Sequence, residues 1–146
     1  MDVEWAMTID CTDPPRLAAF WRTALGYADA PVPEGFATRE EWLTRWEVPP
    51  QEWDDAAYLH DPRGIRPSIT FLKVPEPKAG KNRLHIDLYP TGRDDSLPYA
   101  RRMEIVDARV AELVTLGASI RKTEGDGESS YFVVMHDPEG NEFCVS

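Results

Sequence analysis

Apolar and polar residues alternate along two stretches of the chain, one near its start and one just past its middle. The first covers residues 3–11 and the second runs from Arg83 to Tyr89. Because successive side chains of a strand point to opposite faces, the alternation predicts two half-buried strands. Further apolar runs between turn-forming residues predict strands over residues 56–59, 67–74, 118–120, 130–135 and 142–146.

A helical repeat of apolar residues follows each alternating stretch. Thr12 or Asp13 is a suitable N-cap, Pro14 and Pro15 fit a first turn, and Gly26 fits the end of the first helix. The second helix is predicted over residues 96–116, before Gly117, with an apolar stripe formed by Tyr99, Met103, Val106, Val110, Leu113 and Val114. Each half of the chain therefore begins strand-then-helix.

The same turn motif closes a predicted hairpin in both halves. His60-Asp61-Pro62-Arg63-Gly64 and His136-Asp137-Pro138-Glu139-Gly140 share the frame His-Asp-Pro-x-Gly, 76 residues apart. Proline presets φ, glycine allows a positive φ, and the aspartate can accept a hydrogen bond from the backbone two residues on. The repeat predicts a duplicated module of order βαβββ.

A tryptophan-rich insertion, residues 34–54, interrupts the first half. Thr38–Glu41 has the pattern of a capping box, and we expect Trp42, Leu43 and Trp46 to share one side of the short helix that follows. Trp42 and Trp46 are either a lid that binds a flat substrate or packing residues at an open core or an oligomer interface. Both interpretations stay open from the sequence.

Composition and charge narrow the function classes. The net charge is −10, so a nucleic-acid backbone or an anionic membrane is not an expected partner. No apolar run approaches the roughly 18 residues that span a bilayer. The acidic start lacks the basic region of a secretory signal, and Cys11 and Cys144 are too few for a disulfide framework, so we expect a cytoplasmic protein.

Several motifs, in this order and spacing, resemble those of the vicinal oxygen chelate superfamily, the glyoxalase/bleomycin-resistance-like proteins. They are Ile9–Pro14 with Phe20-Trp21 and Leu25-Gly26, Val74–Lys78, Lys81–Leu88, Val110 to Ala118, and Asp137–Phe143. The resemblance implies an α+β fold: two βαβββ modules that form a curled mixed sheet around one shared cavity. Residues 1–146 would be one glyoxalase-like domain, with module one at 1–75 and module two at 82–146.

The resemblance also implies a divalent metal held by the first and last strands of the modules. His85 falls on the ligand position of module two's first strand, and Ala6 or Thr8 takes that place in module one. The last strand usually carries its glutamate seven residues after the turn aspartate, which gives Cys144 in module two and Ser68 in module one. Of these, His85 alone has the usual residue type.

The alternation gives an independent set of candidates. If the apolar face of each first strand packs under its helix, the other face lines the cavity. This places His85 near the carboxylates of Asp10, Asp87 and Glu142. Three interpretations of this cluster stay open. His85 is a general base oriented by one carboxylate, or His85 and two carboxylates are a non-standard metal site, or the cluster is a polar network that satisfies buried groups. His60 and His136 are interpreted as turn residues.

These considerations lead to two functional hypotheses. The first is an enzyme of the superfamily, a lyase, isomerase or dioxygenase acting on a small oxygen-rich molecule, with His85, Asp87 and Glu142 as catalytic residues. The second is a non-catalytic protein that binds an antibiotic or aromatic compound. A homodimer is expected, because superfamily members often pair. The predicted substrate-binding residues are Thr8, Asp10, Trp42, Trp46, Thr70, Arg83 and Cys144.

Overall fold

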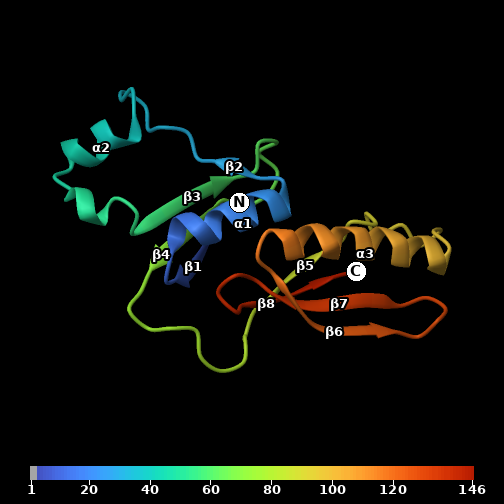
Figure 1. Ribbon diagram of the computed structural model, residues 1–146. Coiled ribbons are helices and arrows are strands. Elements are labelled where there is room, and N and C mark those ends of the chain that lie inside the picture. Colours follow the sequence, from blue (N-terminus) through green and yellow to red (C-terminus); the bar gives the residue numbers. More distant parts are fainter. Residues whose placement is uncertain (1–2) are drawn as a thin grey trace. The chain divides into compact units, whose positions relative to one another are not determined.

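A computed structural model describes residues 3–146. They form two compact units, and the division between the units falls between Pro77 and Lys78. Each unit contains one four-stranded mixed sheet with a long helix on one face (Figure 1). The predicted α+β class with two βαβββ modules is confirmed. No helix within residues 3–146 has the length and apolar character needed to cross a membrane.

The first unit follows the order predicted from the alternation. Its sheet has the strand order β1-β4-β3-β2, in which β1 pairs with β4 in parallel and the other pairs are antiparallel. A short helix, α2, and one 3-10 turn lie between β2 and β3. The elements are β1 (Met7–Cys11), α1 (Pro14–Leu25), β2 (Ala28–Asp29), α2 (Arg39–Arg45), η1 (Pro50–Glu52), β3 (Ala56–His60) and β4 (Ile69–Lys73).

The second unit repeats this topology without the insertion. Its sheet has the order β5-β8-β7-β6, and its single parallel pair is again the first strand with the last. The long helix lies along one face of the sheet (Figure 1). The elements are β5 (Ile86–Leu88), α3 (Tyr99–Thr115), β6 (Ser119–Gly125), β7 (Tyr131–His136) and β8 (Glu142–Val145).

One face of each sheet is buried within its own unit, and the side chains of the other face, the open face, are partly or fully exposed. In the second unit, the buried residues of α3 are Val106, Val110 and Leu113, and those of β8 are Phe143 and Val145. The first unit buries Leu17, Phe20 and Trp21 of α1 with Leu59, Ile69 and Phe71 of its sheet. Burial of these apolar side chains is the main stabilising term in each unit.

The duplicated turn works as the motif predicts. Asp61 accepts a hydrogen bond from the backbone N–H of Arg63, and Asp137 accepts one from Glu139, each two residues on. Gly64 and Gly140 have φ of 65° and 85°, a conformation that favours glycine. The two aspartates are the only buried charged residues in the described part of the chain. Their side chains therefore fix the turns from inside.

The structure differs from the sequence prediction in the region of the insertion. Thr38 caps α2 as predicted, its hydroxyl accepting a hydrogen bond from the N–H of Glu41. Trp46, however, is not on the side of buried Leu43: it is 63% exposed, because it follows the last turn of α2 and stacks near the Arg45 guanidinium. The two-residue strand β2 was also not predicted, since so short an edge strand has no periodicity.

Candidate metal centre

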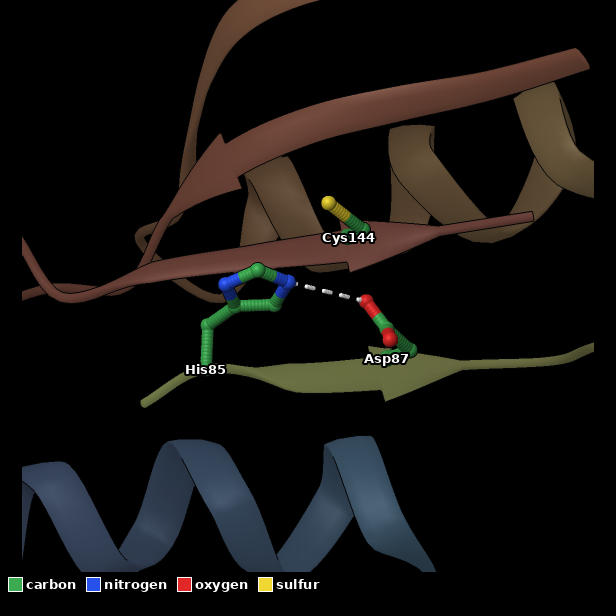
Figure 2. Close-up of side chains that lie close together, drawn as sticks. All are labelled: His85, Asp87 and Cys144. Atoms are coloured by element: carbon green, nitrogen blue, oxygen red, sulfur yellow. Dashed lines mark ion pairs between the residues drawn. The ribbon is translucent and has the colours of Figure 1, made fainter. Parts of the chain in front are cut away.

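Three side chains from two neighbouring strands converge on the open face of the second unit's sheet. Asp87 of β5 is the register partner of Cys144 of β8, and His85 lies one residue before β5. One ligand atom from each of the three lies within 4.8 Å of the others. His85 Nε2 is 3.4 Å from an Asp87 carboxylate oxygen, and Figure 2 shows this pair with Cys144 on the adjacent strand.

Strand alternation explains why these side chains meet. Leu88, Phe143 and Val145 are buried, so their neighbours in sequence must point to the opposite face. Parallel pairing of β5 with β8 then sets Asp87 beside Cys144. Two strands more than fifty residues apart in sequence thus contribute to one cluster.

The surroundings of Cys144 favour the protonated thiol. Its pKa is raised mainly by burial, and also by the negative charges of Asp87 and Glu142 and by a hydrogen bond with Asp87. Lys81 acts in the opposite direction. The cluster therefore combines a thiol with carboxylates, an arrangement that a bound cation would stabilise.

Glu142 lies next to this cluster. It forms an ion pair with Lys81, which lowers the pKa of Glu142, and His85 and His136 lower it further. Its backbone N–H donates to the Asn82 side-chain oxygen at 3.1 Å. His136 is the register partner of Glu142, so it faces the same side of the sheet. The sequence interpretation of His136 as a turn residue missed this; extending the predicted strand 130–135 by one residue would have shown it.

A cleft of about 530 Å³ adjoins the cluster, and Asp87 and Cys144 form part of its wall. Two arginines also line it. Arg93 lies 3.9 Å over the Tyr89 ring, and Arg102 Nη1 donates to the Ser129 carbonyl at 2.5 Å. Arg93 and Arg102 carry no signal in the sequence, because a loop and a helix bring them to the strands only in the folded unit.

The first unit has no such cluster at the corresponding positions. Pairing of β1 with β4 sets Thr8 beside Thr70, as Asp87 is set beside Cys144. Ala6 precedes β1 by one residue, as His85 precedes β5. The counterpart of Cys144 is therefore Thr70, and the count that gave Ser68 is wrong.

The error in that count has a simple cause in the hairpin connections. Leu59 pairs with Ile69 in the first hairpin, whereas Met135 pairs with Phe143 in the second. The first connection is thus two residues longer. Counting forward from the turn aspartate therefore places a module-one residue two positions too early.

The other predicted substrate-binding residues lie outside the cluster of His85, Asp87 and Cys144. Thr70 and Trp42 line a smaller hollow in the first unit, of about 240 Å³. Thr8, Asp10 and Arg83 are exposed on their strands or beside them. Trp46 is not among the residues that line the hollow.

A family model, the glyoxalase-like domain, matches residues 6–146, nearly the whole chain. The chain belongs to this family. No curated protein matches it.

Solved structures with the glyoxalase-like fold cover almost the whole chain at low identity. A glyoxalase/bleomycin resistance protein/dioxygenase family enzyme from Burkholderia phytofirmans PsJN is 17% identical with a TM-score of 0.59, over 96% of this chain and 94% of that one. A possible glyoxalase from Bacillus cereus is 14% identical with a TM-score of 0.55, over 98% of both chains.

A third neighbour holds a metal. It is a mutant of the fosfomycin resistance protein FosX from Listeria monocytogenes, complexed with Mn(II) and 1S,2S-dihydroxypropylphosphonic acid. It is 12% identical with a TM-score of 0.58, over 99% of this chain and 89% of that one. At these identities the likeness shows the fold alone.

The donor set of this glyoxalase-like chain fits a divalent metal. Imidazole nitrogen, carboxylate oxygen and thiolate sulfur are all zinc ligands, and catalytic zinc sites use three protein ligands with one open position. Bond lengths of about 2.0–2.3 Å place two ligands of one ion roughly 3.3–3.8 Å apart. His85 and Asp87 have such a spacing, 3.4 Å, and the Cys144 sulfur lies within 4.8 Å of both ligand atoms.

Proposed function

We propose that this chain is a metal-dependent glyoxalase-like enzyme whose centre is His85, Asp87 and Cys144. One observation carries the proposal: three ligand atoms of three different kinds gather within 4.8 Å of one another. Two of the three residues also form the wall of a cleft large enough for a small molecule. We further propose a small, oxygen-rich substrate and a reaction of the lyase, isomerase or dioxygenase type.

Each residue of the cluster has a role in this proposal. His85, Asp87 and Cys144 would hold the ion, which supplies Lewis acidity toward substrate oxygens when bound. Glu142 remains ionised beside His85, since Lys81 lowers its pKa. A carboxylate with a lowered pKa is a weak base, so we assign Glu142 the positioning of His85.

The fold neighbour with Mn(II) supports a divalent ion in this architecture. The thiol of Cys144 favours a softer ion than manganese, because thiolate ligands select metals such as zinc. We therefore expect zinc to bind more tightly than manganese.

Elemental analysis of protein purified without a metal-affinity tag tests the proposal. We expect near-stoichiometric divalent metal in the wild type, either as purified or after zinc is added and excess removed. His85→Ala and Cys144→Ala should each lose it. Cys11→Ala is the matched control: Cys11 is a buried cysteine of β1 in the first unit and should have no effect on the metal.

Retention of metal by both variants of the cluster would overturn the proposed centre. A wild type that binds neither zinc nor manganese would do so as well, and would favour the second hypothesis, a non-catalytic small-molecule binding protein. That alternative draws support from the tryptophan-lined hollow of the first unit. A homodimer remains part of the proposal, and sedimentation equilibrium would measure it.

A further inference from the structure

The first unit contains a hollow that the proposed metal centre does not use. It has a volume of about 240 Å³ and lies on the open face of the sheet, between the insertion and strands β3 and β4. Because a water molecule occupies about 30 Å³ of liquid, the hollow has room for roughly eight to ten non-hydrogen atoms. This is the size of a single substituted aromatic ring.

The charge of its wall is opposite to that of the chain. The protein has 26 acidic residues and a net charge of −10. Among the described residues that line the hollow there is no aspartate or glutamate, and Arg39 supplies a permanent positive charge. This wall therefore favours an anionic group, although the chain as a whole is acidic.

Arg39 is held in place by two contacts. Its guanidinium lies 4.8 Å over the Tyr58 ring, and Nη2 donates a hydrogen bond to the Ala56 carbonyl at 3.1 Å. A planar guanidinium fixed in this way is suited to binding a carboxylate. Trp42 of α2 lines the same hollow, and an indole is a suitable packing partner for an aromatic ring.

His60 adds a third recognition group. Its Nδ1 is buried and has no hydrogen-bond partner among the described residues, although His60 lines the hollow. A buried polar atom without a partner is costly, so a ligand group that bonds to it once the ring turns toward the hollow gains affinity. A hydroxyl suits either tautomer of the ring, because it can both donate and accept.

We propose that the hollow binds a monocyclic aromatic carboxylate with a ring hydroxyl. The ring packs on Trp42, the carboxylate pairs with Arg39, and the hydroxyl bonds to His60 Nδ1. This site is built from first-unit residues and goes beyond the proposed metal centre. Its three recognition groups match a ring, an anion and a hydroxyl in one molecule.

Isothermal titration with 4-hydroxybenzoate, in buffer containing EDTA, tests the site without any bound metal. We expect saturable binding with a Kd of about 0.1–1 mM, the range for a ligand of this size. Arg39→Gln should weaken it at least tenfold, and Trp42→Ala by a similar factor. Trp46→Ala is the matched control, since exposed Trp46 does not line the hollow, and should leave the Kd unchanged.

Ligand analogues separate the three recognition groups. 4-Hydroxybenzyl alcohol lacks the carboxylate and should bind at least tenfold more weakly, and benzoate lacks the hydroxyl and should bind several-fold more weakly. Absence of saturable binding would overturn the proposal, as would equal affinities of wild type and Arg39→Gln. If Trp42→Ala does not fold, nuclear Overhauser contacts between ligand ring protons and the Trp42 indole in the wild type decide: their presence supports the site and their absence refutes it.

Discussion

The two units of this protein share one backbone plan but present different chemistry on the same face. Both pair their first and last strands in parallel and close a hairpin with His-Asp-Pro-x-Gly. At equivalent positions of this face, the second unit has Asp87 and Cys144, and the first has Thr8 and Thr70. The two units fold their backbones alike, so equivalent positions present their side chains on the same face. Residue identity then decides whether a candidate metal ligand set results.

The comparison extends to the neighbouring strand. Val134 in the second unit corresponds to Tyr58 in the first, and both units place a histidine at the end of that strand, His136 and His60. The second unit therefore surrounds its cluster with charged groups, whereas the first offers aromatic rings and one arginine. Two modules with the same fold can thus present side chains suited to different ligands.

Exchanging the paired residues should produce the largest effect. Cys144→Thr gives the second unit the first unit's residue and removes one of three ligands, so zinc affinity should fall at least about a hundredfold, or roughly 2.7 kcal/mol. Chelator-competition titration with zinc measures this. Thr70→Cys is the reciprocal control and should leave the wild-type site intact. Unchanged zinc affinity in Cys144→Thr would show that the ligands lie elsewhere.

The buried turn aspartate of the second unit should have the next largest effect. Asp137 accepts hydrogen bonds from the backbone of Glu139 and Asn141 and from the Asn141 amide. Asp137→Ala leaves these part-buried donors without partners, and we expect a loss of about 2 kcal/mol in the free energy of unfolding. Urea unfolding followed by circular dichroism measures it. Asp137→Asn keeps one acceptor oxygen and should lose less; an equal loss would argue against the hydrogen bonds as the cause.

The corresponding turn of the first unit should respond to pH. A hydrogen bond from the Arg63 side chain is the main cause that lowers the pKa of Asp61 to about 2. The unfolded value is about 3.9, so the stability that this pairing contributes is present above pH 4 and is lost as pH falls from 4 toward 2. The effect is smaller than that of Asp137→Ala, because the Arg63 side chain is 57% exposed.

Arg63→Gln tests this difference between the two turns. The variant should be less stable than the wild type at pH 7, and the gap should close between pH 4 and pH 2. Urea midpoints at several pH values measure it. A gap that stays constant over this range would show that Arg63 stabilises the unit by packing instead of by charge.

Much of the fold was predictable because its signals are local. The N-cap of α1, the end of that helix at Gly26, the buried stripe of α3 and the Asp-Pro-x-Gly turns all depend on residues within a few positions of one another. Alternation likewise predicted that Glu142 and Cys144 share a face. The structure agrees, because the alternate residues of β8, Phe143 and Val145, are buried on the other face. The strand β2 escaped prediction because two residues carry no period.

The candidate site was predictable in part. His85, Asp87, Glu142 and Cys144 were all named from alternation and family resemblance, and the structure brings His85, Asp87 and Cys144 together. The cleft arginines and the ion pair of Lys81 with Glu142 were not predicted, nor was the His60 nitrogen that lacks a partner within residues 3–146. Each depends on contacts between segments distant in sequence.

The sequence by itself determined the two repeated frames, their turns, and which side of each strand faces away from the core. These follow from backbone geometry and burial, which act over a few residues. Only the tertiary structure decided which exposed side chains meet. Interstrand hydrogen bonds set the register of β5 against β8, and this register places Asp87 beside Cys144; a hairpin connection longer by two residues puts Thr70 at the equivalent place in the first unit.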